Sequence, residues 1–106
     1  MTPLACNIGV LSPSERQAYD ALTRDLFSAA TGRTPTRSGY TFELDAKRVT
    51  PAEVGQWIAF EQRCCPFFDF RLDVARENGR MTLTLGGPAG VQAFIDVELA
   101  AVTSSP

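Results

Sequence analysis

Apolar residues recur at helical spacing in three stretches of the chain, and the first follows Ser12. Ser12, Pro13 and Glu15 occupy the N-cap, N1 and N3 positions of a capping box, which predicts the start of a helix. We expect this helix to run to about Ala30, with Gly32 as its stop. Its apolar positions are Ala18, Leu22, Leu26 and Ala29.

A second helix is predicted from Thr50 by the same device. Thr50, Pro51 and Glu53 repeat the order of N-cap, N1 and N3. Its inward stripe is expected to comprise Val54, Trp57, Ile58, Glu61 and Cys65, with Cys64 close by. This stripe places a carboxylate on an apolar helix face.

The spacing changes to strict alternation in three other stretches, which predicts strands. The first covers residues 37–45, the second leaves Pro66 and covers 68–74, and the third covers 81–85. Asn78 and Gly79 offer the favoured two-residue turn between the last two strands, so we expect an antiparallel hairpin. After Gly86, Gly87 and Pro88, a last helix carries the apolar stripe Val91, Phe94, Ile95 and Leu99.

Together these patterns predict an α+β fold in the order α-β-α-β-β-α, with helices packed on one face of a small antiparallel or mixed sheet. A chain of 106 residues with 44% hydrophobic content fits one domain, residues 1–106. A short sheet with exposed edges makes a homodimer a reasonable partner arrangement.

Charge and composition exclude several classes of partner. A net charge of −2 and a pI near 5.0 give no basic footprint for nucleic acid. No apolar run approaches the roughly 18 residues of a membrane span, and the first residues lack a signal-peptide pattern. Three cysteines form an odd set, which fits a reducing compartment better than a secreted disulfide scaffold. We therefore expect a cytoplasmic protein.

Histidine is absent from the sequence, and this removes much familiar chemistry. Without it there can be no Ser-His-Asp triad, no Cys-His nucleophile pair and no zinc site with imidazole ligands. The remaining candidate groups are Cys6, Cys64, Cys65, nearby carboxylates and arginines, and the phenols of Tyr19 and Tyr40.

Two adjacent cysteines at the end of the second helix are the most informative feature, in the segment EQRCCPFF, residues 61–68. Pro66 disfavours the α region for Cys65, so Cys64 can end the helix while Cys65 is extended and both sulfurs converge. Apolar neighbours raise a thiol pKa, whereas a soft cation favours the thiolate. Two thiolates would suit Hg(II) or Cu(I), and a third from Cys6 would suit As(III); Zn(II) is a further candidate, and no organic cofactor is indicated.

Glu61 precedes this pair by one turn and has three alternative roles. It reaches solvent, pairs with a cation such as Arg16 or Arg63, or serves the thiol site, because an unpaired buried charge is costly. The first two are the commoner outcomes for a glutamate. With Cys6, Cys64 and Cys65, Glu61 completes the candidate metal ligands.

The chain resembles a small, largely uncharacterised bacterial family. The resemblance rests on Ala5-Cys6, a following Ser-Pro-Ser-Glu-Arg helix start, and the motif E-x-x-C-C-P-F-x-x-F from Glu61 to Phe70. Some members are associated with heavy-metal and arsenic resistance gene neighbourhoods. The resemblance implies that the three cysteines and Glu61 act as one constellation that binds a soft metal or metalloid ion.

Two other classes of function remain open. One is a thiol-dependent enzyme, either a redox protein or a protein that cleaves carbon–metal bonds with Asp69 or Glu61 as proton donor. The other is a structural or interaction module in which Cys64 and Cys65 fill the junction between Trp57 and the Phe-rich strand, because free cysteine is often buried.

Overall fold

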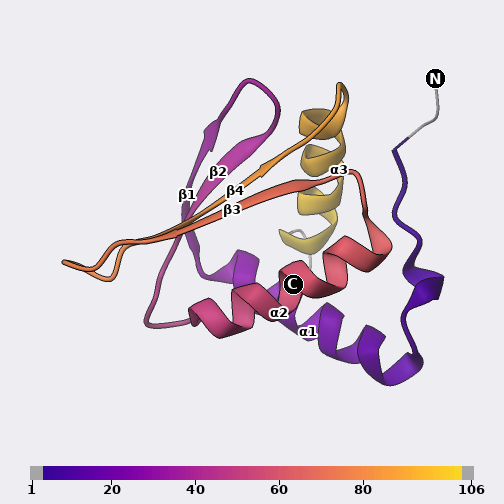
Figure 1. Ribbon diagram of the computed structural model, residues 1–106, viewed down its shortest axis with the longest axis horizontal. Helices are drawn as coiled ribbons and strands as arrows, with labels where there is room; N and C mark the ends of the chain where they lie inside the picture. Colours follow the sequence, from indigo (N-terminus) through magenta and orange to yellow (C-terminus); the bar gives the residue numbers. More distant parts are fainter. Residues whose placement is uncertain (1–3, 104–106) are drawn as a thin grey trace.

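The computed structural model describes residues 4–103 as helices packed over one face of a four-stranded antiparallel sheet (Figure 1). The elements follow in the order η1 (Ile8–Val10), α1 (Pro13–Ser28), β1 (Ala30–Pro35), β2 (Tyr40–Leu44), α2 (Pro51–Cys64), β3 (Asp69–Val74), β4 (Met81–Gly86) and α3 (Val91–Thr103). The predicted α+β class is confirmed, and the sheet is antiparallel throughout.

Both α1 and α2 begin with the capping boxes that the sequence predicts. The Ser12 hydroxyl accepts a hydrogen bond from the Glu15 N–H at 3.2 Å, and the Glu15 carboxylate accepts one from the Ser12 N–H at 2.9 Å. Thr50 and Glu53 repeat the arrangement at 3.1 and 2.9 Å. Each box satisfies N–H groups that a helix start would otherwise leave unpaired.

The sheet contains one strand more than the sequence pattern predicts. The helix α1 ends at Ser28 rather than near Ala30, and β1 follows it almost immediately. β1 has no apolar alternation because it is an edge strand that is exposed along nearly its whole length. It pairs with β2 alone, and the register shifts between Ala30 and Gly32. The strand predicted over 37–45 is β2.

The strand order is β1-β2-β4-β3, so the two central strands carry the core. Their alternate residues point toward the helices and are buried, namely Tyr40, Phe42, Leu44, Met81, Leu83 and Leu85. The intervening positions are polar, and the hydroxyls of Thr41 and Thr84 lie 2.9 Å apart. The β3–β4 hairpin forms as predicted, with Gly79 at a φ of +64°, but Ala75 pairs with Arg80, so its turn spans the four residues 76–79 rather than two. Its tip extends beyond the helices (Figure 1).

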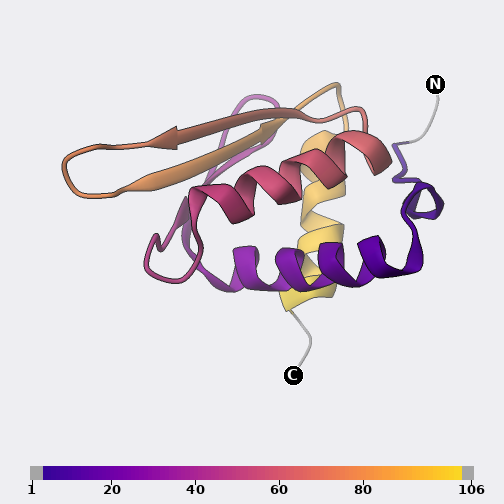
Figure 2. The same ribbon diagram turned by 60° about the horizontal axis from the view of Figure 1, so that its bottom comes forward.

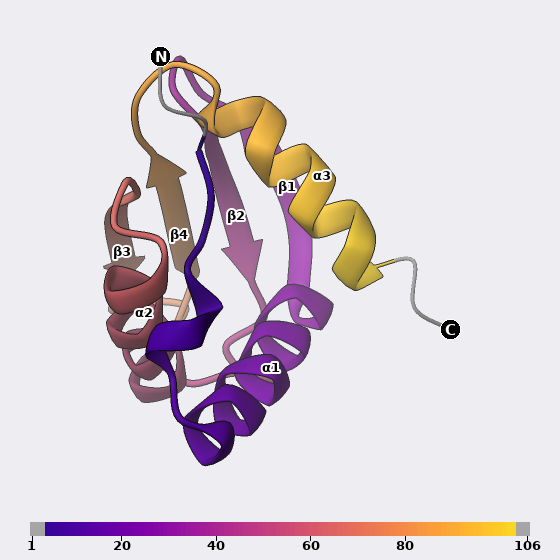
Figure 3. The same ribbon diagram turned by 90° about the vertical axis from the view of Figure 1, so that its right-hand side faces the viewer.

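All three helices lie on the same side of the sheet, and α1 contacts both α2 and α3 (Figure 2). Seen from the side, α2 lies over β3 and β4, and α3 lies toward β1 (Figure 3). Residues 4–12, which precede α1, descend between α2 and α3 (Figure 3). This path brings Cys6 to the C-terminal end of α2.

The inward stripe of α2 agrees with its prediction, since Val54, Trp57, Glu61, Cys64 and Cys65 are buried, and Phe60 is buried as well. The stripe predicted for α1 is partly wrong. Ala18 is exposed, and the neighbouring Tyr19 is turned inward instead. Tyr19 thereby becomes the α1 residue that meets Glu61.

Candidate functional site

The site lies where α2 ends and the chain turns toward β3. α2 ends at Cys64, and Cys65 leaves the helix with φ −128° and ψ 70°, as the proline at position 66 requires. The Cys65 N–H still donates to the Glu61 carbonyl at 2.6 Å. This hydrogen bond fixes the backbone of Glu61 relative to that of Cys65.

Cys6 and Cys65 form a disulfide across 59 residues of sequence. Cys6 therefore reaches the cysteine pair at Cys65, a contact that the family resemblance implies and that spacing alone leaves open. Cys64 is the free cysteine and is buried. Its sulfur lies 3.8 Å from the Cys65 sulfur, so the two adjacent sulfurs do converge.

Non-covalent contacts also hold the N-terminal segment against the end of α2. The Asn7 N–H donates to the Cys64 carbonyl at 2.6 Å. The Arg63 guanidinium donates to the Val10 carbonyl at 3.1 Å and pairs with Glu15 at 2.5 Å. These bonds involve residues that follow Cys6 in sequence, so they hold that part of the chain against the end of α2 in addition to the disulfide.

Glu61 is buried, with only 3% of its surface exposed. One carboxylate oxygen, Oε1, accepts a short hydrogen bond from the Tyr19 hydroxyl. The other, Oε2, is buried and has no hydrogen-bond partner. Neither of the commoner roles predicted for Glu61 is correct, because it does not reach solvent and Arg63 pairs with Glu15 instead.

Burial dominates the protonation of this site. Loss of solvent raises the pKa of Glu61 to about 7, although the Tyr19 hydrogen bond opposes the shift. Burial and the nearby Glu61 charge raise the pKa of the Tyr19 phenol. Burial, followed by the Glu61 charge, also raises the pKa of the Cys64 thiol to about 11. Cys64 is therefore a protonated thiol at neutral pH, which makes it a poor nucleophile.

Three side chains bring their ligand atoms together. The sulfurs of Cys6 and Cys65 and a carboxylate oxygen of Glu61 all lie within 4.8 Å of one another, a grouping that could hold a metal ion. Cys64 does not belong to this group, although its sulfur is close to that of Cys65. Asp69, the alternative proton donor in the enzyme hypothesis, is exposed on β3.

A cavity of about 70 Å³ borders this group. Cys6 and Glu61 lie in its wall, together with Tyr19 and Thr23 from α1 and residues from β4 and α3. Most of the remaining lining is aromatic or aliphatic, including Trp57, Phe68, Leu85, Phe94 and Ile95. Sequence patterns assign these residues to the core, and the patterns contain no signal that a space remains between them.

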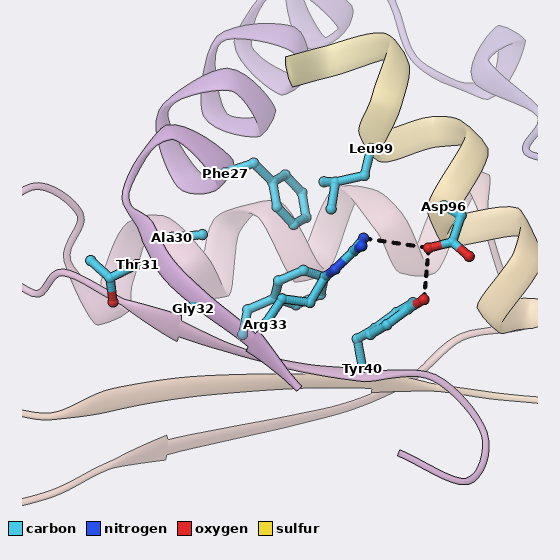
Figure 4. A pocket seen from close by; sticks show the side chains of 9 residues that line it. Phe27, Ala30, Thr31, Gly32, Arg33, Tyr40, Asp96 and Leu99 are labelled. Atoms are coloured by element: carbon cyan, nitrogen blue, oxygen red, sulfur yellow. Dashed lines mark hydrogen bonds and ion pairs between the residues drawn. The ribbon is translucent and has the colours of Figure 1, made fainter. Parts of the chain in front are cut away.

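A larger groove of about 740 Å³ opens next to the cavity, between α3 and the strands β1 and β2. Phe27 and Leu99 line both spaces. In the groove, Asp96 accepts hydrogen bonds from the Tyr40 hydroxyl at 2.7 Å and from Arg33 at 3.4 Å (Figure 4). The groove is therefore polar on the side away from Phe27.

Tyr19 was a candidate from the sequence only as one of two phenols, and its partnership with Glu61 joins residues 42 positions apart. The other phenol, Tyr40, belongs to the outer groove and not to the cysteine site. Within residues 4–103 no helix combines the length and apolar character needed to span a membrane. Comparisons of this chain with protein-family models, with curated proteins and with solved structures find no match.

Proposed function

We propose that the reduced protein binds one soft metal or metalloid ion between Cys6 and Cys65, with Glu61 as a third, weaker donor. The observation that carries this proposal is the group of two sulfurs and one carboxylate oxygen within 4.8 Å of one another, in which Glu61 and Cys65 are buried and Cys6 is half-buried. Metal–sulfur bonds are about 2.3 Å long, so two thiolates on one ion lie no more than about 4.6 Å apart. The disulfide joins the two sulfurs in this state, so reduction lets them separate to this spacing, and the Glu61 oxygen lies within 4.8 Å of both.

Preorganisation supports the proposal. When the disulfide is reduced, the bonds from Asn7 to Cys64 and from Arg63 to Val10 and Glu15 still hold the two segments together. The two thiols therefore remain neighbours in the reduced chain. A site that is already assembled loses less conformational entropy when the ion binds.

The donor set favours thiophilic ions. Sulfur ligands select soft ions, and a buried, largely apolar surrounding disfavours ions that keep their water, such as Mg²⁺. Two thiolates suit Hg(II) or Cu(I). As(III) would need the Cys64 sulfur as a third thiolate, and Zn(II) would lack a full set of four strong donors among these residues. We therefore expect Hg(II) and Cu(I) to bind more tightly than Zn(II).

The same sulfurs cannot form a disulfide and coordinate an ion at once. Binding is accordingly limited to the reduced protein, and oxidation of the Cys6–Cys65 pair would release the ion. The resemblance to the bacterial family with the Cys-Cys-Pro-Phe motif agrees with this proposal, and membership of that family is part of it.

A structural disulfide is the second candidate function. The observation that favours it is the bond itself, which closes a long stretch of chain between two well-ordered segments. In that case the cysteines stabilise the fold and the site takes no ion. The two candidates differ in what the reduced, folded protein does with a soft metal.

The test is titration of anaerobically reduced protein with Hg(II), Cu(I), As(III) and Zn(II), with stoichiometry read by native mass spectrometry. We expect one Hg(II) per chain, lost in Cys6→Ser and Cys65→Ser and kept in Cys64→Ser. Glu61→Gln should weaken binding, whereas Glu77→Gln at the exposed hairpin turn serves as the matched control. Reduced, folded protein that takes no ion would leave the structural disulfide as the function.

A further inference from the structure

The cavity beside the cysteine site is lined mostly by apolar side chains, which a bare inorganic ion does not need as ligands. Cys6 and Glu61 belong both to the group of ligand atoms and to the cavity wall. An ion held by the Cys6 sulfur therefore lies at the edge of a partly enclosed space. Whatever else is bonded to that ion has room on the cavity side.

The wall of the cavity is mostly apolar, and its polar members are Tyr19, Thr23, Glu61 and Glu98. The Trp57 N–H donates to the Thr23 hydroxyl at 3.0 Å, and that hydroxyl donates to the Tyr19 carbonyl at 2.8 Å. The Tyr19 hydroxyl donates to Glu61 Oε1. These polar groups are thus occupied with one another, and the buried Glu61 Oε2 faces no protein partner. The aromatic and aliphatic part of the wall favours an apolar group, whereas water is better satisfied next to the Glu61 carboxylate.

The size of the cavity limits what can occupy it. An apolar cavity of about 150 Å³ accepts benzene, and the volume here is about 70 Å³, less than half as much. A methyl or ethyl group fits such a space, whereas a phenyl group does not unless the wall moves. The aromatic rings of Phe68 and Phe94, whose centroids are 5.9 Å apart, form part of that wall.

We propose that the site takes a thiophilic ion that carries one small alkyl group, with the ion on Cys6 and Cys65 and the alkyl group in the cavity between Trp57, Phe68 and Phe94. This inference rests on the proposed function and names its ligand class. Monoalkyl mercury(II) is the simplest such species. On binding, the thiol protons are lost to the buffer, the two sulfur–mercury bonds form, and the carbon–mercury bond stays intact.

The groove outside the cavity offers an access route. Phe27 from α1 and Leu99 from α3 line both spaces and project into the groove (Figure 4). A ligand that crosses from the groove to the sulfurs passes these two apolar side chains. An alkylated ion carries less charge and less bound water than the bare dication, so this route favours it.

The experiment compares methylmercury(II), phenylmercury(II) and inorganic Hg(II) on reduced, full-length protein, with glutathione as the competing thiol. We expect methylmercury to bind at least about 10-fold more tightly than phenylmercury, since excess bulk in a small, mostly apolar pocket is worth roughly this much. A ¹³C-labelled methyl group should show an upfield ring-current shift and nuclear Overhauser contacts to Trp57, Phe68 and Phe94.

A variant of the cavity wall provides the second arm. Phe94 is partly exposed, so Phe94→Ala enlarges the cavity with a modest loss of packing. The phenylmercury disadvantage should fall to roughly 3-fold or less in this variant. Phe67→Ala is the matched control, because Phe67 contacts Phe94 without lining the cavity, and it should keep the wild-type preference.

The outcomes separate the two proposals. Equal binding of methyl and phenyl ligands, with no contacts from the bound methyl group to the aromatic rings, would overturn the cavity assignment and leave thiolate binding of Hg(II) intact. Failure of inorganic Hg(II) itself to bind would overturn the proposed function, and the ligand class with it. The resonance of the methyl group bound to the wild-type protein tests whether the alkyl group lies in the cavity. This test does not depend on a variant that must fold.

Discussion

Two carboxylates near the end of α2, those of Glu15 and Glu61, differ in burial, in hydrogen-bond partners and in pKa. Glu15 is exposed, closes a capping box with Ser12 and pairs with Arg63, whose hydrogen bond lowers the pKa of Glu15 to about 2. Glu61 is buried with a phenol as its only hydrogen-bond partner among the described residues, and burial raises its pKa to about 7. Glu15 supports the fold, whereas ionised Glu61 opposes it.

At the end of α2, the outer face, with Glu15 and Arg63, is explained by its contribution to the stability of the fold. The inner face, with Glu61 and the sulfurs, is not. A helix cap and an ion pair account for Glu15 and Arg63 completely. A buried carboxylate beside two sulfurs and a cavity does not stabilise the fold in this way. A role in binding at the site explains its position. The predictions below test this division.

The largest expected effect belongs to the inner face, at the disulfide. Closing about 60 residues removes chain entropy worth about 4 kcal/mol from the unfolded state. Cys6→Ser should therefore lower the free energy of unfolding by up to that amount relative to oxidised wild type, as measured by urea denaturation. The same measurement in reductant should show little difference between the two proteins. A full loss that persists in reductant would mean that Cys6 stabilises the fold by packing.

The next effect concerns pH and Glu61. The folded state binds the Glu61 proton more tightly than the unfolded state, so the free energy of unfolding should fall as pH rises from about 4.5 to about 7. A shift of this size corresponds to roughly 3 kcal/mol. Glu61→Gln should remove most of this decline in denaturation curves measured across that range. Glu77→Gln is the control and should retain it.

Tyr19 offers a smaller test of the same face. Tyr19→Phe removes the donor to Glu61 Oε1 and leaves a second oxygen of this carboxyl without a partner, at a cost of about 1–2 kcal/mol. Because that hydrogen bond lowers the pKa of Glu61, its loss should raise this pKa further, which the pH dependence of unfolding would register. Tyr40→Phe, which removes the bond to Asp96, should leave that pH dependence unchanged.

The outer face should give the smallest effect. Arg63→Met removes an exposed ion pair with Glu15 and a hydrogen bond to the Val10 carbonyl, and exposed contacts of this kind add little stability. Chemical denaturation of the oxidised protein should show a smaller loss than that of Tyr19→Phe. A loss of several kcal/mol would contradict the division between the two faces, because it would make the ion pair a principal anchor of the fold.

Local sequence signals predicted most of the fold. The two capping boxes located the starts of α1 and α2, Pro66 located the end of α2, and Asn78-Gly79 located the hairpin turn. β1 escaped prediction because it is an exposed edge strand, so its stability comes from hydrogen bonds to β2 rather than from an apolar pattern.

The site was predictable in its residues and not in their pairing. Adjacent cysteines after a glutamate pointed to thiol chemistry, but spacing carries no information about a contact across 59 residues. The burial of Glu61 ran against the usual behaviour of a glutamate. Its partner, Tyr19, became visible only once α1 and α2 were packed together.

The separation of Cys6 from Cys65 also has a consequence during protein synthesis. At translation rates of about 5–20 residues per second, Cys6 precedes Cys65 by roughly 3 to 12 s. Throughout that interval the nascent chain carries Cys6 without its partner, because the segment that forms α2 has not been completed. The order of synthesis therefore makes Cys6 the cysteine most open to capture by other thiols or by metal in the growing chain.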